Sequence, residues 1–300
     1  MPELPEVETV CRQLAPFVER RRIERLEILD ARWSRPFPPE QMESALAGRT
    51  IIEVTRRGKY ILLRLDDGST LTMHLRMTGN LVIGGERIGG PRLYEGEHDM
   101  ELHLRALFSL DDGSTLRFTD PRRFGHAHLL APNEIGPYFD SRLGVEPLGG
   151  ELTPQYILNE AAGRTAPLKS FLLDQRRIAG IGNIYADEAL HRASLHPLSP
   201  AGSMRLEHAE ELRDGIVDSL ELGIANGGSS IDDYRDARGE EGSMQEEFLV
   251  HTREGEPCPR CGEPISRIVV GGRSTYFCAG CQVRLRRRPR RRRAGGRTTR

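Results

Sequence analysis

The 300-residue sequence contains no apolar run of about 18 residues or more, which argues against a transmembrane helix. Its acidic start also lacks the basic and apolar regions of a signal peptide. We therefore expect a cytoplasmic protein with reduced cysteines and no membrane contact. The length suggests two domains, at roughly 150 residues per domain.

Lysine is nearly absent as well, because only Lys59 and Lys169 occur among 43 basic residues and arginine supplies the rest. An ammonium group is compact and can lose its proton when it is buried, whereas a guanidinium group stays charged. The two lysines are therefore candidates for positions that require an ammonium group, although chance would also explain them.

The formal net charge of −1 conceals an uneven distribution. Residues 284–300 contain ten arginines and no acid, which leaves 33 basic against 44 acidic residues in 1–283, a net charge of −11. A segment with this charge and almost no apolar content cannot form a core, so we expect a disordered tail over 286–300. A nucleic-acid partner must then be bound by local basic clusters in the body.

Four of the five cysteines form two pairs, Cys258-x2-Cys261 and Cys278-x2-Cys281, separated by 16 residues. This spacing is typical of a zinc ribbon that holds one structural ion, and a redox dithiol is the alternative. Cys11 falls on the apolar face of a predicted helix, where we expect a buried, unreactive thiol.

The chain begins Met1-Pro2-Glu3, and apolar residues at helical spacing predict a helix from about Pro5. If Met1 is removed, Pro2 becomes a secondary amine with a pKa of roughly 7.7 to 8, so part of it is unprotonated near neutral pH. Such an amine can attack a sugar C1′ or an aldehyde to form an iminium ion, an electron sink for eliminations. Glu3 can serve as a general acid, and Glu6 can support it or simply complement the helix dipole.

Alternating residues over 51–83 predict antiparallel strands, with Leu71, Met73, Leu75 and Met77 on one face. The heptapeptide LDDGSTL occurs at 65–71 and again at 110–116, each time between alternating runs, which predicts two hairpins of a sandwich. The Gly-rich insert 84–96 between them, followed by His98, is expected to be an exposed loop.

The second hairpin ends in Thr119-Asp120-Pro121-Arg122-Arg123-Phe124-Gly125, a turn with two cations and an aromatic ring. Such a turn can hold phosphate and stack on a base, while an ion-paired surface turn is the alternative. Met77, at a strand end, is either a core residue or an exposed wedge.

Residues 131–150, rich in Pro and Gly, predict a linker, and helical spacing then appears over 154–162, 167–175 and 203–225. The segment Gly180-Ile181-Gly182-Asn183 opens a further helix, where free amides and the Asn183 side chain can bind an anion or close a packing turn. Arg273, next to two glycines, is predicted at a hairpin tip that can enter a groove or stay in solvent.

Six segments together carry a resemblance: PELPEVETV, RRGKY around Lys59, HLRMTG around Met77, TDPRRFG, GIGNIYADEAL and the cysteine-containing GGRSTYFC. In this order, over nearly the whole chain, they resemble the formamidopyrimidine-DNA glycosylases. Leu4 and DPRRFG favour this branch over the endonuclease VIII branch, whose start usually reads PEGPE.

The resemblance implies an α+β fold in which DNA lies between two halves. The expected parts are an N-terminal antiparallel β-sandwich with flanking helices (2–133), a linker (134–150), a helix-two-turn-helix domain (151–250), a zinc-finger β-hairpin (251–285) and the tail (286–300). A monomer that binds damaged double-stranded DNA is expected.

The activity implied is base-excision repair: removal of 8-oxoguanine and formamidopyrimidines, followed by lyase cleavage of the strand. Pro2 would attack C1′, Glu3 would protonate the sugar oxygen, and β and δ eliminations would follow. By the same resemblance three groups, Lys59, Asn183 and Arg273, would grip phosphates around the lesion, and the first and last would assist proton transfer.

Further residues are assigned to DNA by the same resemblance. Met77, Arg122 and Phe124 would fill the hole left by a flipped base and wedge the opposite strand. His98, Arg164 and Lys169 align with DNA-contacting or near-lesion positions, although Arg164 stands where the family usually has Lys. The acidic loop 229–242 and the arginine tail depart from the family pattern.

Two other classes remain open at this point. A DNA-binding paralogue without catalysis could lose Pro2 or Glu3, and both are present here. A zinc-ribbon protein directed at RNA or the ribosome would prefer structured RNA over a duplex that contains a lesion.

Overall fold

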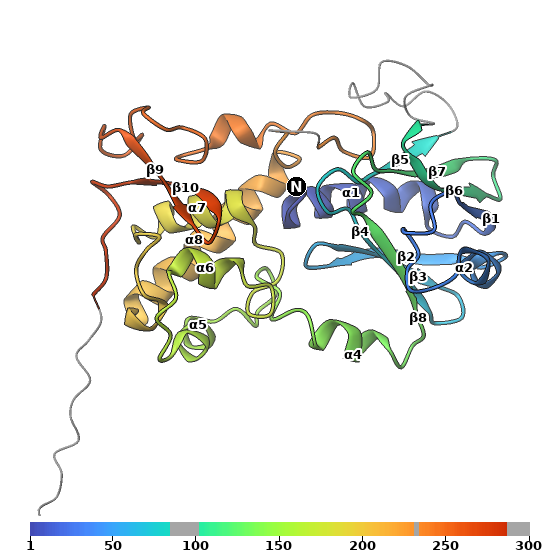
Figure 1. The fold of residues 1–300 in the computed structure, drawn as a ribbon, viewed down its shortest axis with the longest axis horizontal. Helices are drawn as coiled ribbons and strands as arrows, with labels where there is room; N and C mark the ends of the chain where they lie inside the picture. Colours follow the sequence, from blue (N-terminus) through green and yellow to red (C-terminus); the bar gives the residue numbers. More distant parts are fainter. Residues whose placement is uncertain (85–101, 231–233, 287–300) are drawn as a thin grey trace, which may run out of the picture.

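The computed structural model describes residues 1–84, 102–230 and 234–286, and Figure 1 shows two halves with the chain start between them. One half is a β-sandwich, and the other contains helices and a two-stranded hairpin, which confirms the predicted α+β class. His98 and the tail from 287 onward lie outside the described residues. Within the described ranges, no helix has both the length and the apolar character needed to cross a bilayer.

Helix α1 (Leu4–Val18) begins where the sequence predicts it. Glu6, in its first turn, accepts a hydrogen bond from the Glu3 amide at 2.7 Å, which satisfies an amide at the helix start. Leu4 packs into the core of the helical half, whereas the buried residues from Val7 onward pack into the sandwich core. One helix therefore contributes to both cores.

The sandwich consists of two four-stranded antiparallel sheets, as predicted. The first sheet has the order β1 (Ile23–Ile28), β6 (Leu104–Leu110), β7 (Thr115–Thr119), β5 (Asn80–Gly84). The second has the order β2 (Ile51–Arg57), β3 (Tyr60–Leu65), β4 (Thr70–His74), β8 (His126–Leu130). The two LDDGSTL repeats form the turns of the β3–β4 and β6–β7 hairpins, and each places its glycine at a positive φ of 83° or 84°, which glycine adopts without strain.

The sandwich core is apolar and is closed at one side by helix α2 (Pro39–Leu46), which contributes Met42 and Leu46. Trp33 packs edge-on against Phe108 and tilted against Phe118, with ring centroids 6.1 and 5.4 Å apart. Aromatic pairs at this distance and angle stabilise a core beyond their buried area.

Strand β4 ends earlier than its alternation predicts. The strand stops at His74, and Arg76 adopts a φ of 55°, which turns the chain away from the sheet. Met77 is therefore 42% exposed instead of continuing the buried face of Leu71 and Met73. The alternation in the sequence does not reveal this turn because Arg76, which is not a glycine, takes the left-handed conformation.

The helical half contains the helices expected at 154–162, 167–175 and 203–225, although the second is shorter. Helix α4 (Ile135–Asp140) comes before this half and packs on the sandwich through Phe139, against Leu62 and Leu130. The described elements of the helical half are α5 (Pro154–Ala161), α6 (Leu168–Leu173), α7 (Asn183–Arg192), η1 (Ala201–Ser203), α8 (Leu206–Ala225) and η2 (Met244–Glu247). The hairpin that follows is formed by β9 (Ile265–Val270) and β10 (Arg273–Cys278). The linker predicted over 134–150 contains α4, and the predicted domain boundaries remain predictions.

The segment between α8 and the hairpin returns to the first half of the molecule. Tyr234 and Ala237 are buried in the sandwich core, and Gln13 of α1 donates a hydrogen bond to Asp236 at 2.6 Å. The acidic stretch 229–242 is thus partly anchored on α1, a contact between residues more than 200 positions apart that the local sequence does not indicate.

Candidate functional site

Glu3 is held by the first turn of α7. The amide of Ile184 donates to Glu3 Oε1 at 3.1 Å, and the amide of Tyr185 faces Oε2 at 3.5 Å. Gly182 leaves the space for this contact, because a Cβ there would lie 2.1 Å from Glu3 Cδ. The positive end of a helix favours a carboxylate. Glu3 is therefore fixed and buried next to Pro2, which is also buried.

Glu6 joins the chain start to two distant segments. Its Oε1 accepts hydrogen bonds from the Tyr185 hydroxyl and from the Ser229 amide, both at 2.8 Å, and its Oε2 accepts one from the Glu3 amide. Burial, and then the negative charge of Glu3, raise the pKa of Glu6 above its ordinary value. Glu6 thus orients the residues around Pro2 from a fully buried position.

Lys59 lies in the tight turn between β2 and β3, and this turn is clamped by Glu146. The Glu146 carboxylate accepts from the Gly58 amide at 2.6 Å and pairs with Arg56 at 2.5 Å and Arg57 at 2.9 Å. Burial acts to raise the pKa of Glu146, but the two arginines and the amide outweigh it, and the net pKa lies below the ordinary value. Because Glu146 comes from the predicted linker, the position of Lys59 depends on the junction between the two halves.

Lys59 is 6% exposed, and its ammonium interacts electrostatically with the candidate catalytic groups. Burial lowers the pKa of Lys59, the carboxylates of Glu3 and Glu6 act to raise it, and the Arg273 guanidinium lowers it. The net effect is a pKa below the ordinary lysine value. An ammonium group in this setting can exchange a proton more readily than an arginine could.

Arg273 lies at the tip of the β9–β10 hairpin, as predicted. Gly271 and Gly272 form the turn with φ values of 58° and 77°, and Arg273 begins β10 with an exposed side chain. Asn183, the first residue of α7, donates from its amide nitrogen to the Ser274 carbonyl at 3.0 Å. Asn183 therefore fixes the hairpin against α7, and its second amide hydrogen is left for another acceptor.

Lys169 and Arg164 were both predicted to contact DNA, and the structure places them differently. Lys169 is fully buried and pairs with Asp187, so it does not present its charge at the surface. Arg164 is exposed after α5, where its guanidinium pairs with Glu160 of that helix. The ion pair of Arg164 is therefore local to the C-terminal end of α5 and does not include Glu3 or Lys59.

Two loops at the edge of the sandwich present the predicted insertion residues to solvent. Phe124 is 51% exposed, and the Arg122 guanidinium lies over its ring at 4.9 Å from the centroid. Buried Asp120 holds this loop by accepting hydrogen bonds from the amides of Arg122 and Gly125, at 3.1 and 2.7 Å.

The same carboxylate accepts a hydrogen bond from Thr78, the residue after exposed Met77. Asp120 therefore connects the Arg122–Phe124 loop to the Met77 loop. Three exposed residues of mixed apolar and cationic character are thus held by a common anchor.

A group of aromatic and histidine side chains supports these loops and was not found from the sequence. His74 and His126 are register partners on β4 and β8, with stacked rings 5.6 Å apart, and Tyr60 packs edge-on against His74. His74 Nδ1 accepts the Arg76 amide at 2.9 Å, so the ring is neutral and helps to fix the turn before Met77. The pKa of His74 lies well below its ordinary value because of burial and then Arg76.

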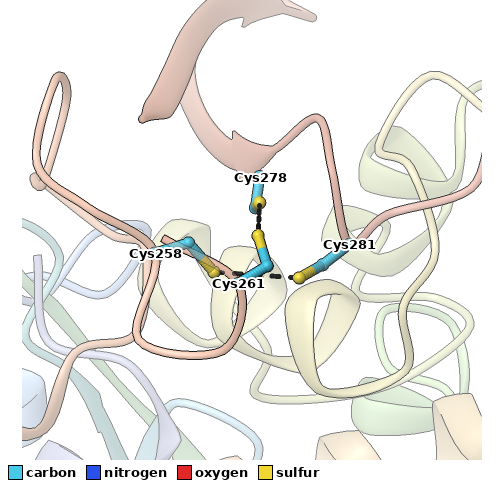
Figure 2. A group of neighbouring side chains, drawn as sticks. All are labelled: Cys258, Cys261, Cys278 and Cys281. Atoms are coloured by element: carbon cyan, nitrogen blue, oxygen red, sulfur yellow. Dashed lines mark hydrogen bonds between the residues drawn. The ribbon is translucent and has the colours of Figure 1, made fainter. Parts of the chain in front are cut away.

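The four predicted zinc ligands converge at one end of the hairpin. Figure 2 shows the thiols of Cys258, Cys261, Cys278 and Cys281 facing one another, and their sulfur atoms all lie within 4.8 Å. Four sulfur donors at this separation fit the tetrahedral coordination of one structural zinc ion. His191 of α7 places Nε2 3.4 Å from Cys258 Sγ, so this metal site also contacts the helix that holds Glu3.

Three family models match consecutive parts of the chain. The formamidopyrimidine-DNA glycosylase N-terminal domain matches residues 1–127, the H2TH domain of the same family matches 143–235, and the zinc finger found in FPG and IleRS matches 255–283. The chain belongs to the formamidopyrimidine-DNA glycosylase family. It is therefore an enzyme, a DNA glycosylase and lyase of base-excision repair.

Relatives and solved structures of the family match nearly the full chain. Formamidopyrimidine-DNA glycosylase of Chloroflexus aurantiacus is 45% identical over 287 residues, which cover 95% of this chain and 99% of the relative. That of Symbiobacterium thermophilum is 44% identical over 283 residues, covering 94% and 89%.

Among solved structures, Lactococcus lactis Fpg in complex with DNA that contains an abasic site has a TM-score of 0.82. It shares 34% identity, over 94% of this chain and all of that chain. The same protein bound to DNA with an N7-benzyl-Fapy-dG has a TM-score of 0.83, also at 34% identity, over 94% of this chain and 99% of that chain.

For this family member, the geometry brings together many of the residues predicted from the sequence. Glu3, Lys59, Asn183 and Arg273 surround the chain start, and the four cysteines form one metal site. Sequence reasoning missed Glu146, His74 and Asp187. The local signal for Asp187 was its position in GIGNIYADEAL, one turn after Asn183, but its partners lie elsewhere in the chain.

Proposed function

We propose that this chain removes oxidised purines, 8-oxoguanine and formamidopyrimidines, from damaged double-stranded DNA and then cleaves the strand. It acts as a monomer in the cytoplasm, on chromosomal DNA. The observation that carries the proposal is the Glu3 carboxylate, which α7 fixes directly next to Pro2. The family and its DNA-bound Lactococcus lactis relatives support the choice of substrate.

The reaction begins after removal of Met1, when the Pro2 nitrogen is a free secondary amine. This nitrogen attacks C1′ of the damaged nucleotide, the bond from C1′ to the base breaks, and the base leaves with the proton that the Pro2 nitrogen loses. Glu3 donates a proton to the ring oxygen of the sugar as the ring opens. The product is a cationic iminium between Pro2 and C1′.

The iminium then acts as an electron sink for two eliminations. Loss of a C2′ proton expels the 3′ phosphate, and a second elimination expels the 5′ phosphate. A one-nucleotide gap with phosphates on both sides remains. Lys59 and Arg273 hold the phosphates next to the lesion and assist proton transfer, and Asn183 holds the same part of the backbone through its free amide hydrogen.

The exposed loops supply the groups that replace the flipped base. Met77 fills the space in the helix, and Arg122 and Phe124 wedge the opposite strand. Unstacking a base step costs a few kcal/mol, and inserted side chains offset part of this cost. The zinc finger carries Arg273 to the DNA and needs its metal to fold, because so small a hairpin has little core.

Borohydride trapping on a duplex with one 8-oxoguanine tests the proposal. Processed protein is expected to form a covalent adduct whose attachment maps to residue 2, whereas protein that retains Met1 is not, because its Pro2 nitrogen is an amide. Structured RNA should not compete for the adduct. Equal trapping with the N-terminus blocked would move the nucleophile to another amine, with Lys59 as the next candidate.

A further inference from the structure

Lys169 and Asp187 form an ion pair in the interior of the helical half. Both side chains are 0% exposed, and the Lys169 ammonium also donates to the Asn183 carbonyl at 2.8 Å. Burial lowers the pKa of Lys169, whereas the charge of Asp187 acts to raise it. Two of the three donors of the ammonium are thus used inside the protein, and DNA cannot reach this group in the observed conformation.

Asp187 has a second partner, which comes from the segment that leads into the zinc finger. His251 Nδ1 lies 2.8 Å from Asp187 Oδ2, and the His251 ring packs edge-on against Tyr276 of β10 at 5.1 Å. The neighbouring residue Glu188 accepts hydrogen bonds from the amides of residues 249–251, all at 2.9 or 3.0 Å. The entry to the finger is therefore fixed on α7.

The same helix holds the tip of the hairpin through Asn183. The backbone carbonyl of Asn183 accepts a hydrogen bond from Lys169, and its side-chain amide donates to the Ser274 carbonyl next to Arg273. Asp187 of α7 thereby contacts Lys169 of α6 and His251 of the segment before the finger, and His251 in turn contacts Tyr276 of β10. The tip that carries Arg273 is one end of this connected set, and the first turn of α7 that holds Glu3 is the other.

Stability alone is a weak reason for a buried ion pair, because apolar replacements of similar volume are often neutral or stabilising. Specification of geometry is a better explanation when the pair lies between elements that must meet at a defined angle. Here the β9–β10 hairpin carries Arg273, the proposed phosphate contact, and α7 holds Glu3, the proposed general acid.

We propose that Lys169, Asp187 and His251 form a positioning triad that sets Arg273 against the first turn of α7. Lys169 then affects DNA binding through Arg273 and not by contact with a phosphate. This inference rests on the proposed function, in which Arg273 grips DNA.

A matched pair of substitutions at His251 tests the triad. His251→Phe keeps an aromatic ring against Tyr276 but removes the hydrogen bond to Asp187, whereas His251→Asn loses the ring but keeps a donor near the position of Nδ1. The dissociation constant for a duplex with a tetrahydrofuran abasic analogue is measured, together with the zinc content. His251→Phe is expected to weaken binding by about 5-fold or more, which is the lower end of typical coupling between sites, and His251→Asn should restore much of it.

The deciding measurement repeats His251→Phe in an Arg273→Ala background. If the triad acts through Arg273, the double variant binds no more weakly than Arg273→Ala alone. If the two losses multiply, the triad is structural only and the inference fails, while the proposed function stands. If Arg273→Ala binds as tightly as the unmodified protein, Arg273 does not grip DNA, and both the assignment and the inference fail.

A second variant covers the case in which His251→Phe does not fold. Lys169→Met with Asp187→Leu removes both charges together and leaves neither partner as an unpaired buried charge. In the Arg273→Ala background this double replacement should leave affinity and salt dependence unchanged. A further fall of ~0.9 in the log-log salt slope would mean that Lys169 itself contacts a phosphate, which overturns the inference.

Discussion

At the scale of single residues, Glu3 shows how backbone amides of a distant segment fix the orientation of a carboxylate. The sequence places Glu3 next to Pro2, and its role as a general acid, inferred from this adjacency, remains a prediction. Its orientation comes from the amides of Ile184 and Tyr185, about 180 positions later. No pattern near the chain start indicates them, because hydrogen bonds between distant segments leave no local periodicity.

Glu3→Gln should slow base excision strongly while it leaves DNA binding nearly unchanged. The amide cannot donate a proton to the sugar, and general acid catalysis contributes ~10²- to 10⁴-fold to the rate. Single-turnover excision at saturating enzyme and the dissociation constant for undamaged duplex measure the two effects separately. Glu24→Gln, an exposed change on β1, is the control. Normal excision by the Glu3→Gln variant would remove Glu3 from the mechanism.

The two lysines illustrate what scarcity in a sequence can and cannot reveal. Both occupy buried positions where burial lowers the pKa of the ammonium, which fits the first of the two explanations for their scarcity, a position that requires an ammonium group. The sequence could not distinguish them further. Lys59 faces Glu3 and Glu6, whereas Lys169 is enclosed by Asp187, and only the fold separates these two environments.

At the scale of elements, strands with clear turn residues and helices with regular apolar spacing were predictable. The LDDGSTL turns, α1 and the cysteine hairpin follow from local rules of sequence. The end of β4 was not predictable, because Arg76, which is not a glycine, takes the left-handed conformation there. The histidine pair on β4 and β8 also escaped prediction, since the register between strands so far apart in the chain is fixed by the sandwich as a whole.

This histidine pair predicts a loss of stability in acid. Burial, and then the charges of Arg76 and His128, lower the pKa of His126 to about 4. In the unfolded chain a histidine titrates near ~6.5, so the unfolded state binds more protons as the pH falls from about 6.5 to about 4. The free energy of unfolding therefore decreases over this range.

His126→Phe should reduce that decrease by about 2 kcal/mol between pH 7.5 and pH 5, because phenylalanine takes up no proton in the unfolded state. His74, His128, Tyr60, Tyr138 and the nearby arginines, which face the same cluster, remain in the variant. Urea unfolding at the two pH values measures the change. If the curves of both proteins shift in parallel with pH, His126 does not carry this effect.

At the scale of the whole molecule, the acidic body and the arginine-rich C-terminal segment carry opposite charges. Residues 1–283 carry a net charge of −11, which repels DNA overall, while residues 287–300 contain eight of the ten terminal arginines. Leu285 packs on the helical core and its amide donates to Ser199 Oγ at 3.0 Å, so the last described residues belong to the folded body.

Truncation after Arg286 keeps the Leu285–Ser199 hydrogen bond and removes most of the terminal charge. Binding to undamaged duplex should weaken, and its log-log salt slope should fall by ~0.9 for each phosphate that the tail no longer neutralises. Single-turnover excision at saturating enzyme should stay constant, since phosphate contacts position a protein without taking part in the chemistry. Identical salt slopes with and without the tail would show that these arginines do not bind DNA.

Because α1 packs into the cores of both halves, the order in which they are synthesised determines when its first turn becomes buried. The residues that fix the chain start, in α7 and at Ser229, leave the ribosome about 180 to 230 residues after Pro2, which at ~5–20 residues per second is on the order of ten seconds or more. The first turn of α1 cannot be enclosed before then. Removal of Met1, which the proposed function requires, can therefore take place while the nascent chain is still growing, before the fold buries Pro2.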